Sequence, residues 1–431
     1  MIKQYFKQAL AQLRQHPLIS AVSVAGTALA IFLIMLVVMM QEVQTVPFSP
    51  ESNRDRFLHV KYMSLGNKEW GFDSSNGPMS VNTAKELYQS LKTPEAVTVY
   101  MAFTEATPVC LPSQPSISVD KQETDDQFWK VFDFQFIDGK PYDQAEFDAG
   151  LPVAVITRSV ARALFGTAED VSGREFLLNH APYRVAGVVE DVSTLASIAY
   201  GQLWIPYTST NVGKSTWSGG HMGYMSCTIL ARSRDDFDAI REESLRRLEA
   251  YNQVICEDGW NIIHRNRPYE QEKAVINQSA NVEFDVAPER RRRLFVYLIL
   301  LVIPAINLSS MTQSRLRQRV SEIGVRRAFG STRLEIMGQI LMENFMVTMV
   351  AGFLGFLMSV TFACWGSDIL FSVGYSSTYV LPKTDLSILL HASTFGLALL
   401  FCFMLNLLST GIPAWLASRT GIVEAISGRL H

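Results

Sequence analysis

Four long uncharged stretches limit what this chain can fold into more than any other feature. A helix needs about 20 apolar residues to cross about 30 Å of hydrocarbon, at about 1.5 Å per residue. The four stretches are longer than this, with 24, 21, 24 and 33 residues at Pro17–Met40, Leu294–Ser314, Asn344–Ser367 and Leu386–Ser418. The sequence therefore predicts a membrane protein with four transmembrane α-helices, at 17–41, 294–314, 340–366 and 387–412.

The first stretch also has features of a signal peptide, because basic residues precede it and Ala28-Leu29-Ala30 resembles a cleavage site. Its apolar run continues for ten residues past that site, which favours an uncleaved membrane anchor. In residues 1–16, apolar side chains recur at helical spacing. This pattern predicts an amphipathic cytoplasmic helix on the membrane surface, with a plain helical extension of the first span as the alternative.

Basic residues predict the orientation of the chain. Cytoplasmic segments are enriched in Lys and Arg, and cytoplasmic N- and C-termini place eleven of them inside. Four consecutive arginines, Arg290–Arg293, then lie outside, against this rule. Long translocated domains are largely exempt from it, and arginine stems can lie along the membrane edge with their heads on lipid phosphate. The eleven inside residues are Lys3, Lys7, Arg14, Arg315, Arg317, Arg319, Arg326, Arg327, Arg333, Arg419 and Arg429.

A large extracytoplasmic domain is expected between the first two spans, at 42–290. Strand-like runs alternate there with helical ones, such as 56–62 followed by a helix at about 82–91. The region is long enough for its own core, and the alternation predicts an α+β fold inserted between helices 1 and 2. Its middle part, about 111–224, is richer in turns. We expect an inserted subdomain there, within a fold formed by the flanks 42–110 and 225–290.

Catalytic motifs are missing from the sequence. It has no GxxxxGK[ST] loop for nucleotide phosphates, no HExxH, no GxSxG and no zinc-type spacing among its seven histidines. We therefore predict no catalytic residues, no metal and no cofactor, and the net charge of −3 gives no reason to expect nucleic acid. Cys110, Cys227 and Cys256 of the exported domain allow at most one disulfide, whose pairing stays open.

The cytoplasmic segment 315–335 separates the second and third spans, ahead of the short extracytoplasmic loop 367–386 and the cytoplasmic tail 413–431. A short helix that docks in a partner's groove needs apolar anchors, small residues for close approach and charges that fix its register. Gly330 predicts a helix end, and Ser331 or Thr332 the start of the next helix. The alternative is a basic loop that only touches anionic lipid. The candidate contact residues are the apolar Ile323, Val325 and Phe329, the small Gly324, Ala328 and Gly330, and the charged Glu322, Arg326 and Arg327.

Residues 322–330, EIGVRRAFG, resemble the E-I-G-x-R-R-A-x-G signature of MacB/FtsX-like permeases, the membrane subunits of mechanotransmission-type ABC transporters. Further landmarks of that family have counterparts in the same order, at 126–139 (DQFWKVFDFQFIDG), 164–166 (LFG), 185–191 (VAGVVED) and 413–414 (PA). Phe329 stands where the family commonly has an aliphatic residue, and Ser331 where alanine is usual. The choice of partner can therefore differ while the docking mode is kept.

The resemblance implies a permease subunit with a MacB-like periplasmic core domain, in the bacterial cytoplasmic (inner) membrane. It would couple ATP hydrolysis by a separate ABC ATPase subunit to work in the periplasm, in efflux or export, and would itself be no enzyme. Expected partners are that ATPase, bound through 322–330, a second copy or a paralogous permease, membrane lipid, a periplasmic adaptor and an outer-membrane component. The alternatives are a lipoprotein-releasing or cell-wall-hydrolase-regulating complex, or a membrane-anchored sensor or scaffold without an ATPase.

Overall fold

The computed structural model describes residues 17–69, 71–277, 279–318, 320–371 and 392–419. It divides into a helical unit, made of 1–42, 287–367 and 386–431, and a mixed unit of strands and helices, made of 43–286 and 368–385. The helix expected in 1–16, and most of the loop 367–386 and of the tail 413–431, lie outside the described residues.

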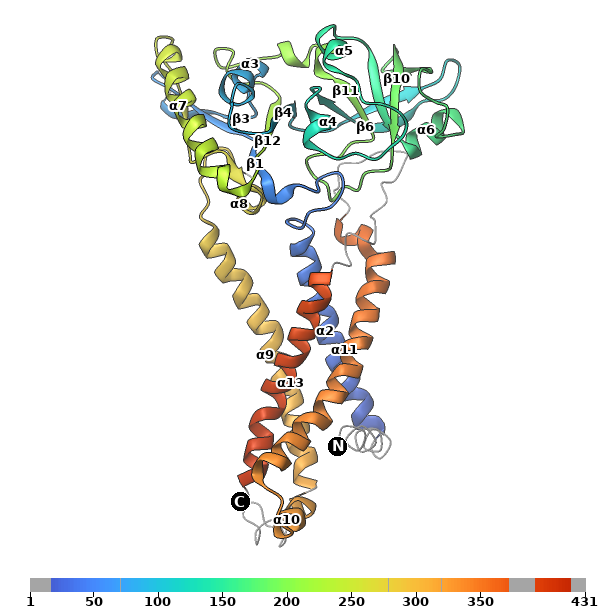
Figure 1. Ribbon diagram of the computed structural model, residues 1–431, viewed down its shortest axis with the longest axis vertical. Coiled ribbons are helices and arrows are strands. Elements are labelled where there is room, and N and C mark those ends of the chain that lie inside the picture. Colours follow the sequence, from blue (N-terminus) through green and yellow to red (C-terminus); the bar gives the residue numbers. More distant parts are fainter. Residues whose placement is uncertain (1–16, 70, 278, 319, 372–391, 420–431) are drawn as a thin grey trace. The chain divides into compact units, whose positions relative to one another are not determined.

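The helical unit contains a long helix over each predicted span, and a short helix over the cytoplasmic segment (Figure 1). By length and composition, two stretches among the described residues, Val24–Glu42 and Arg333–Ala363, can cross a membrane. The helices are α2 (Pro17–Glu42), α9 (Val286–Gln318), α10 (Val320–Ala328), α11 (Arg333–Phe371) and α13 (Ala392–Arg419).

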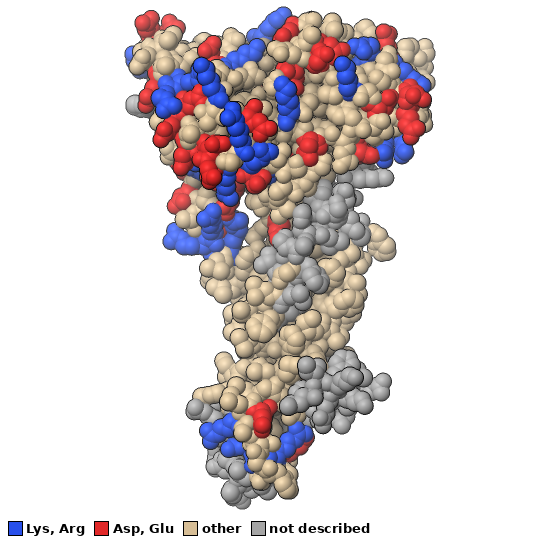
Figure 2. All heavy atoms as spheres, in the orientation of Figure 1, with Lys and Arg blue, Asp and Glu red and all other residues tan. Residues whose placement is uncertain are grey.

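Small and aromatic residues pack these helices together. A Cβ atom added to Gly355 of α11 would lie 2.6 Å from the carbonyl oxygen of Ala28 in α2, so only glycine allows this approach. Phe32 of α2 and Phe362 of α11 meet edge to face at 5.9 Å between ring centroids. On the face that Figure 2 shows, an uncharged surface of the helical unit lies between its two charged ends. An uncharged, apolar outer surface of this kind suits a lipid environment.

In the mixed unit, a first layer of antiparallel strands runs in the order β4-β12-β1-β14. Helix α7 (Phe237–Ile255), the short helix α3 (Val81–Ala84) and the π-helical turn η2 (Lys85–Gln89) contribute to the core that buries Leu58, Val99, Ile229 and Ile240. The four strands are β1 (Phe57–Val60), β4 (Ala96–Met101), β12 (Met225–Leu230) and β14 (Tyr269–Glu270). A separate three-stranded sheet has the order β13 (Trp260–Ile263), β2 (Met63–Asn67), β3 (Gly71–Gly77).

The middle of the mixed unit is a closed ring of strands. The chain of pairings β11-β8-β10-β9-β5-β6 returns to β11 through the parallel register 203–206 with 121–124, while β7 (Phe136–Gly139) adds to β10. Val119, Ile156, Val185 and Leu203 fill its core. The ring strands are β5 (Glu105–Cys110), β6 (Ile117–Thr124), β8 (Val153–Thr157), β9 (Glu175–Leu178), β10 (Ala181–Val189) and β11 (Leu203–Pro206).

The ring extends from 105 to 206, whereas the sequence places the inserted subdomain at about 111–224. The difference has a physical reason: β5 starts the ring before the turn-rich stretch, and Met222, in the glycine-rich part of 207–224, forms a bridge with Met79 outside the ring. Short helices α4 (Phe128–Val131), α5 (Gln144–Asp148) and α6 (Arg158–Phe165) connect the ring strands. Cys110, Cys227 and Cys256 are free thiols.

Candidate partner-binding site at the turn between α10 and α11

Helix α10 ends in a hydrogen-bonded turn that requires glycine. The Ser331 amide donates to the Arg326 carbonyl at 3.2 Å, and the Gly330 amide donates to the Arg327 carbonyl at 3.1 Å. This pair of bonds is the Schellman motif, and Gly330 has the positive φ of 98° that the motif needs at that position. The predicted helix end at Gly330 is confirmed.

Helix α11 begins directly after this turn, with a capping box. The Glu335 amide donates to Thr332 Oγ1 at 3.2 Å, and the Thr332 amide donates to Glu335 Oε2 at 2.9 Å. Of the two residues that the sequence offered for the start of this helix, Thr332 is therefore the cap. Specific hydrogen bonds therefore define the end of α10 and the start of α11.

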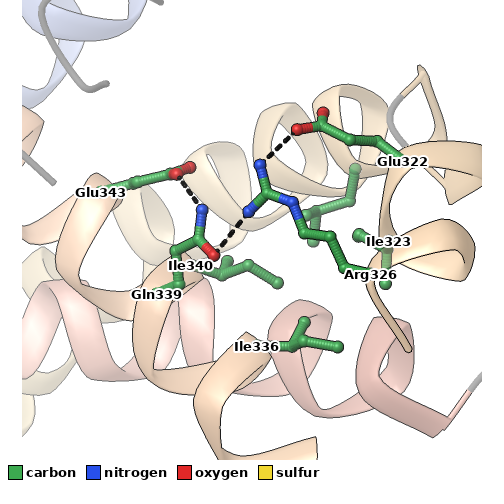
Figure 3. Close-up of a pocket in the computed structure, with 8 residues that line it drawn as sticks. Glu322, Ile323, Arg326, Ile336, Gln339, Ile340 and Glu343 are labelled. Atoms are coloured by element: carbon green, nitrogen blue, oxygen red, sulfur yellow. Dashed lines mark hydrogen bonds and ion pairs between the residues drawn. The ribbon is translucent and has the colours of Figure 1, made fainter. Parts of the chain in front are cut away.

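A chain of polar side chains links α10 to the body of α11 (Figure 3). Arg326 donates from Nη2 to Glu322 Oε1 at 2.5 Å and from Nη1 to Gln339 Oε1 at 2.8 Å. Gln339 in turn donates from Nε2 to Glu343 Oε1 at 2.9 Å. Glu343 is only 5% exposed, so this chain runs from the exposed face of α10 to a buried carboxylate. Arg326 thus binds both helices at once.

Next to this chain lies a small, partly open pocket of about 30 Å³, lined by the polar residues of the chain and by an apolar cluster. Ile323 of α10 packs against Leu316 of α9 and against Ile336 and Ile340 of α11. Figure 3 shows Ile323 beside Ile336 and Ile340. Gly324 is buried on the same side. These two candidate residues therefore attach α10 to its own chain.

Three apolar side chains at the turn point away from the protein. Val325, Phe329 and Leu334 are 46%, 88% and 75% exposed. Exposed apolar residues grouped in this way are typical of a contact surface. Glu322, Ala328 and Gly330 are exposed, and Arg326 and Arg327 are half-buried. The sequence analysis missed Leu334, although an apolar residue two positions after the capping Thr332 was visible in the sequence.

The comparisons with known protein families decide the assignment of the chain. The model of the MacB-like periplasmic core domain matches residues 20–246, which is more than half of the chain, and the model of the FtsX-like permease C-terminal domain matches residues 294–422. The chain belongs to the MacB/FtsX-like family of ABC transporter permeases. It therefore has the periplasmic-type domain and membrane helices of this family, whose permeases are inner-membrane proteins.

The sequence identity with individual relatives is low. The macrolide export ATP-binding/permease protein MacB of Escherichia coli K12 is 26% identical over 242 residues, which are 55% of this chain and 34% of that protein. The chain thus spans about a third of the length of the curated relatives it matches.

Two solved structures are also similar to this MacB/FtsX-like chain. The periplasmic region of MacB from Actinobacillus actinomycetemcomitans is 19% identical, with a TM-score of 0.33, and covers 47% of this chain and 88% of its own. A domain of a putative permease from Porphyromonas gingivalis is 16% identical, with a TM-score of 0.37, and covers 56% and 97%. Because both TM-scores are below 0.5, the assignment depends on the two domain models.

Proposed function

We propose that this MacB/FtsX-like chain is the permease subunit that transmits ATP-driven movement of a separate ATPase subunit to its own extracytoplasmic domain. The observation that carries the proposal is the turn between α10 and α11, which is rigid within the chain and apolar on its outside. In this proposal four helices, α2, α9, α11 and α13, span the membrane, and both termini are cytoplasmic.

The contact surface for the ATPase consists of Val325, Phe329 and Leu334. A helix that lies in a groove uses apolar anchors of this kind, and Phe329 offers the largest exposed ring. Glu322 and Arg327 flank these anchors and fix the register through charge. Ile323 and Gly324 serve the opposite purpose, because they hold α10 on its own chain. In this proposal Glu322, Val325, Arg327 and Phe329 thus face the partner together with Leu334. Ile323 and Gly324 face the chain's own helices.

Movement of α10 passes to α11 because few degrees of freedom separate the two helices. The turn 329–332 is closed by the Schellman motif and the capping box, and Arg326 bridges α10 to Gln339. A push on Phe329 and Leu334 is then carried into α11 as a rigid-body displacement. The work is done by the extracytoplasmic domain, in efflux or export.

The proposal includes the assembly of the permease with its partners. Two permease copies, or one copy and a paralogue, pair over two ATPase subunits. A periplasmic adaptor and an outer-membrane component would extend an export route, for which the E. coli relative named for macrolide export is the model. Release of lipoproteins or control of a wall hydrolase would use the same coupling with a different cargo. A sensor or scaffold would need no ATPase, and the experiment below separates it from all of these.

The test is purification of the tagged full-length chain, in detergent, from membranes of its own host. We expect an ABC ATPase to be retained, and Phe329→Asp or Leu334→Asp to remove it. The matched control is Phe103→Asp, the same change at a 49%-exposed ring of the extracytoplasmic domain, which should leave the complex intact. Absence of an ATPase from the wild-type complex, or its retention by both turn variants, would show that the proposal is wrong.

A further inference from the structure

A buried ion pair lies just beyond the end of α2. Arg54 Nε and Glu51 Oε2 are 2.7 Å apart, and their side chains are 1% and 0% exposed. Burial of two charges costs desolvation energy unless their remaining polar atoms find partners. The partners of this pair are therefore informative.

Arg54 binds two chain segments with one guanidinium group. Nη1 donates to the carbonyls of Val43 and Val46 at 2.6 and 3.0 Å, in the segment that follows α2. Nη2 donates to the carbonyl of Leu195 at 2.9 Å, 141 residues along the chain. The guanidinium carbon also lies 4.2 Å from the centre of the Phe48 ring. The planar five-donor fork of arginine suits such a junction, and the single ammonium of lysine does not.

Glu51 completes the junction from the other side. Its Oε1 accepts hydrogen bonds from the amides of Ile198 and Ala199, both at 2.9 Å. The segment 195–199 lies between β10 and β11, two strands of the closed ring. A second connection lies nearby, where the Ser52 amide donates to Asp133 Oδ1 at 3.3 Å and the Asp133 amide donates to the Pro50 carbonyl at 3.0 Å.

We propose that Arg54 and Glu51 are positioning residues that form a joint between α2 and the strand ring. Without them, the segment 43–49, which precedes the second connection at Pro50 and Ser52, could extend to roughly 23 Å and would absorb a displacement of α2 before it reached the mixed unit. With them, the residues that directly follow Glu42 are fixed to 195–199, and movement of α2 acts on the ring itself. This role rests on the proposed function, since it requires movement driven by an ATPase.

The first test measures the joint by hydrogen–deuterium exchange of the full-length chain in its purified complex. The variants are Arg54→Lys and Glu51→Gln, and the matched control is Arg158→Lys, which alters an exposed pair with Glu190. We expect amides in 43–49 and in 195–199 to exchange faster together in both variants, on the order of 100-fold, with the ring core still protected. Faster exchange in only one of the two segments, or an equal change in the control, would overturn the proposal that these residues form a joint.

The second test measures transmission. In the wild-type complex, trapping the ATPase with ATP should change exchange in 195–199 and in the ring strands. In Arg54→Lys, assembly and ATP hydrolysis should stay within twofold of wild type while this nucleotide-dependent change is lost. A ring that still responds to nucleotide in Arg54→Lys overturns the joint and leaves the proposed function standing. A wild-type complex without an ATPase overturns the proposed function, and the transmission role with it.

Discussion

Gly330 offers the most direct test of a rigid turn between α10 and α11. Its φ of 98° lies in the left-handed region, and no atom lies within 4 Å of a Cβ built on it. The substitution Gly330→Ala therefore creates no clash, and its whole effect is conformational. A non-glycine residue in the left-handed region costs about 1–2 kcal/mol. That cost corresponds to about 5- to 30-fold in the population of turns that are opened.

The assay is hydrogen–deuterium exchange in 326–336 of the full-length protein in detergent. The amides of Gly330 and Ser331, which close the Schellman motif, should exchange about 5- to 30-fold faster in Gly330→Ala. Gly330→Asn should have a smaller effect, because asparagine tolerates the left-handed region better than alanine does. If the turn transmits force, Gly330→Ala also keeps the ATPase bound but reduces the nucleotide response of α11.

Gly338 provides the matched control eight residues away. It lies inside α11, and again no atom lies within 4 Å of an added Cβ. In a helix interior, alanine is favoured over glycine by about 1 kcal/mol, so Gly338→Ala should leave exchange unchanged or slow it. Equal effects of the two substitutions, or unchanged exchange in Gly330→Ala, would refute the reasoning that the turn depends on the backbone conformation of Gly330.

Two further predictions concern other parts of the chain. Burial lowers the pKa of His59 from 6.5 to about 4, so its contribution to stability is present above pH 6.5 and is lost as pH falls towards 4. Between pH 7.5 and 5, the wild type should lose about 2 kcal/mol more unfolding free energy than His59→Gln in chemical denaturation, and the exposed His180→Gln should follow the wild type. In the helical unit, Gly355→Ala places a Cβ 2.6 Å from the Ala28 oxygen and should destabilise the detergent-solubilised protein by about 1–3 kcal/mol. Gly396→Ala, which meets no atom within 4 Å, should not lower the melting temperature.

Local chemistry explains which parts of the site could be predicted. The end of α10 at Gly330 follows from glycine's access to positive φ, and the start of α11 follows from the capping chemistry of Thr332 with Glu335. Both signals lie within four residues of the boundary that they mark. For this reason the end of α10 and the start of α11 could be predicted without any knowledge of the surrounding helices.

The apolar residues predicted to contact a partner lie on different sides of α10. At about 100° per residue, Val325 and Phe329 lie about 200° and 240° around the helix from Ile323. They therefore cannot share a surface with it. The structure accordingly packs the half-buried Ile323 against α9 and α11 and exposes the other two. Helical geometry alone would have separated the two faces, whereas the contribution of Leu334 required the geometry of the turn.

The strand ring could not be predicted from the sequence. It closes through the register of 203–206 with 121–124, two segments that are about 80 residues apart and have no local signal for each other. The many turn residues of the middle region predicted a separate subdomain there. They did not predict its first strand, because the residues of 105–110 alternate along the strand and the strand is polar at its start. Pairing between segments so far apart is decided by the hydrophobic core that they share. The residue pattern of a single segment carries no information about that core.

The role of Arg54 in holding the segment after α2 also could not be identified from the sequence. A second buried arginine, Arg267, bonds the segment that leads to α9, and the two can be compared. Arg267 is buried too and donates to the carbonyl of Ala280, in the segment that leads to α9. Residues 281–285 between that bond and α9 are exposed, but Glu283 still pairs with Lys273 at 2.8 Å, three residues before α9 begins. The bond of Arg54 to Val43, in contrast, starts one residue after α2 ends. Both connections are thus held close to the helical unit, and in the proposed mechanism the one to α2, with the shorter free segment, is expected to pass on more of a helix displacement.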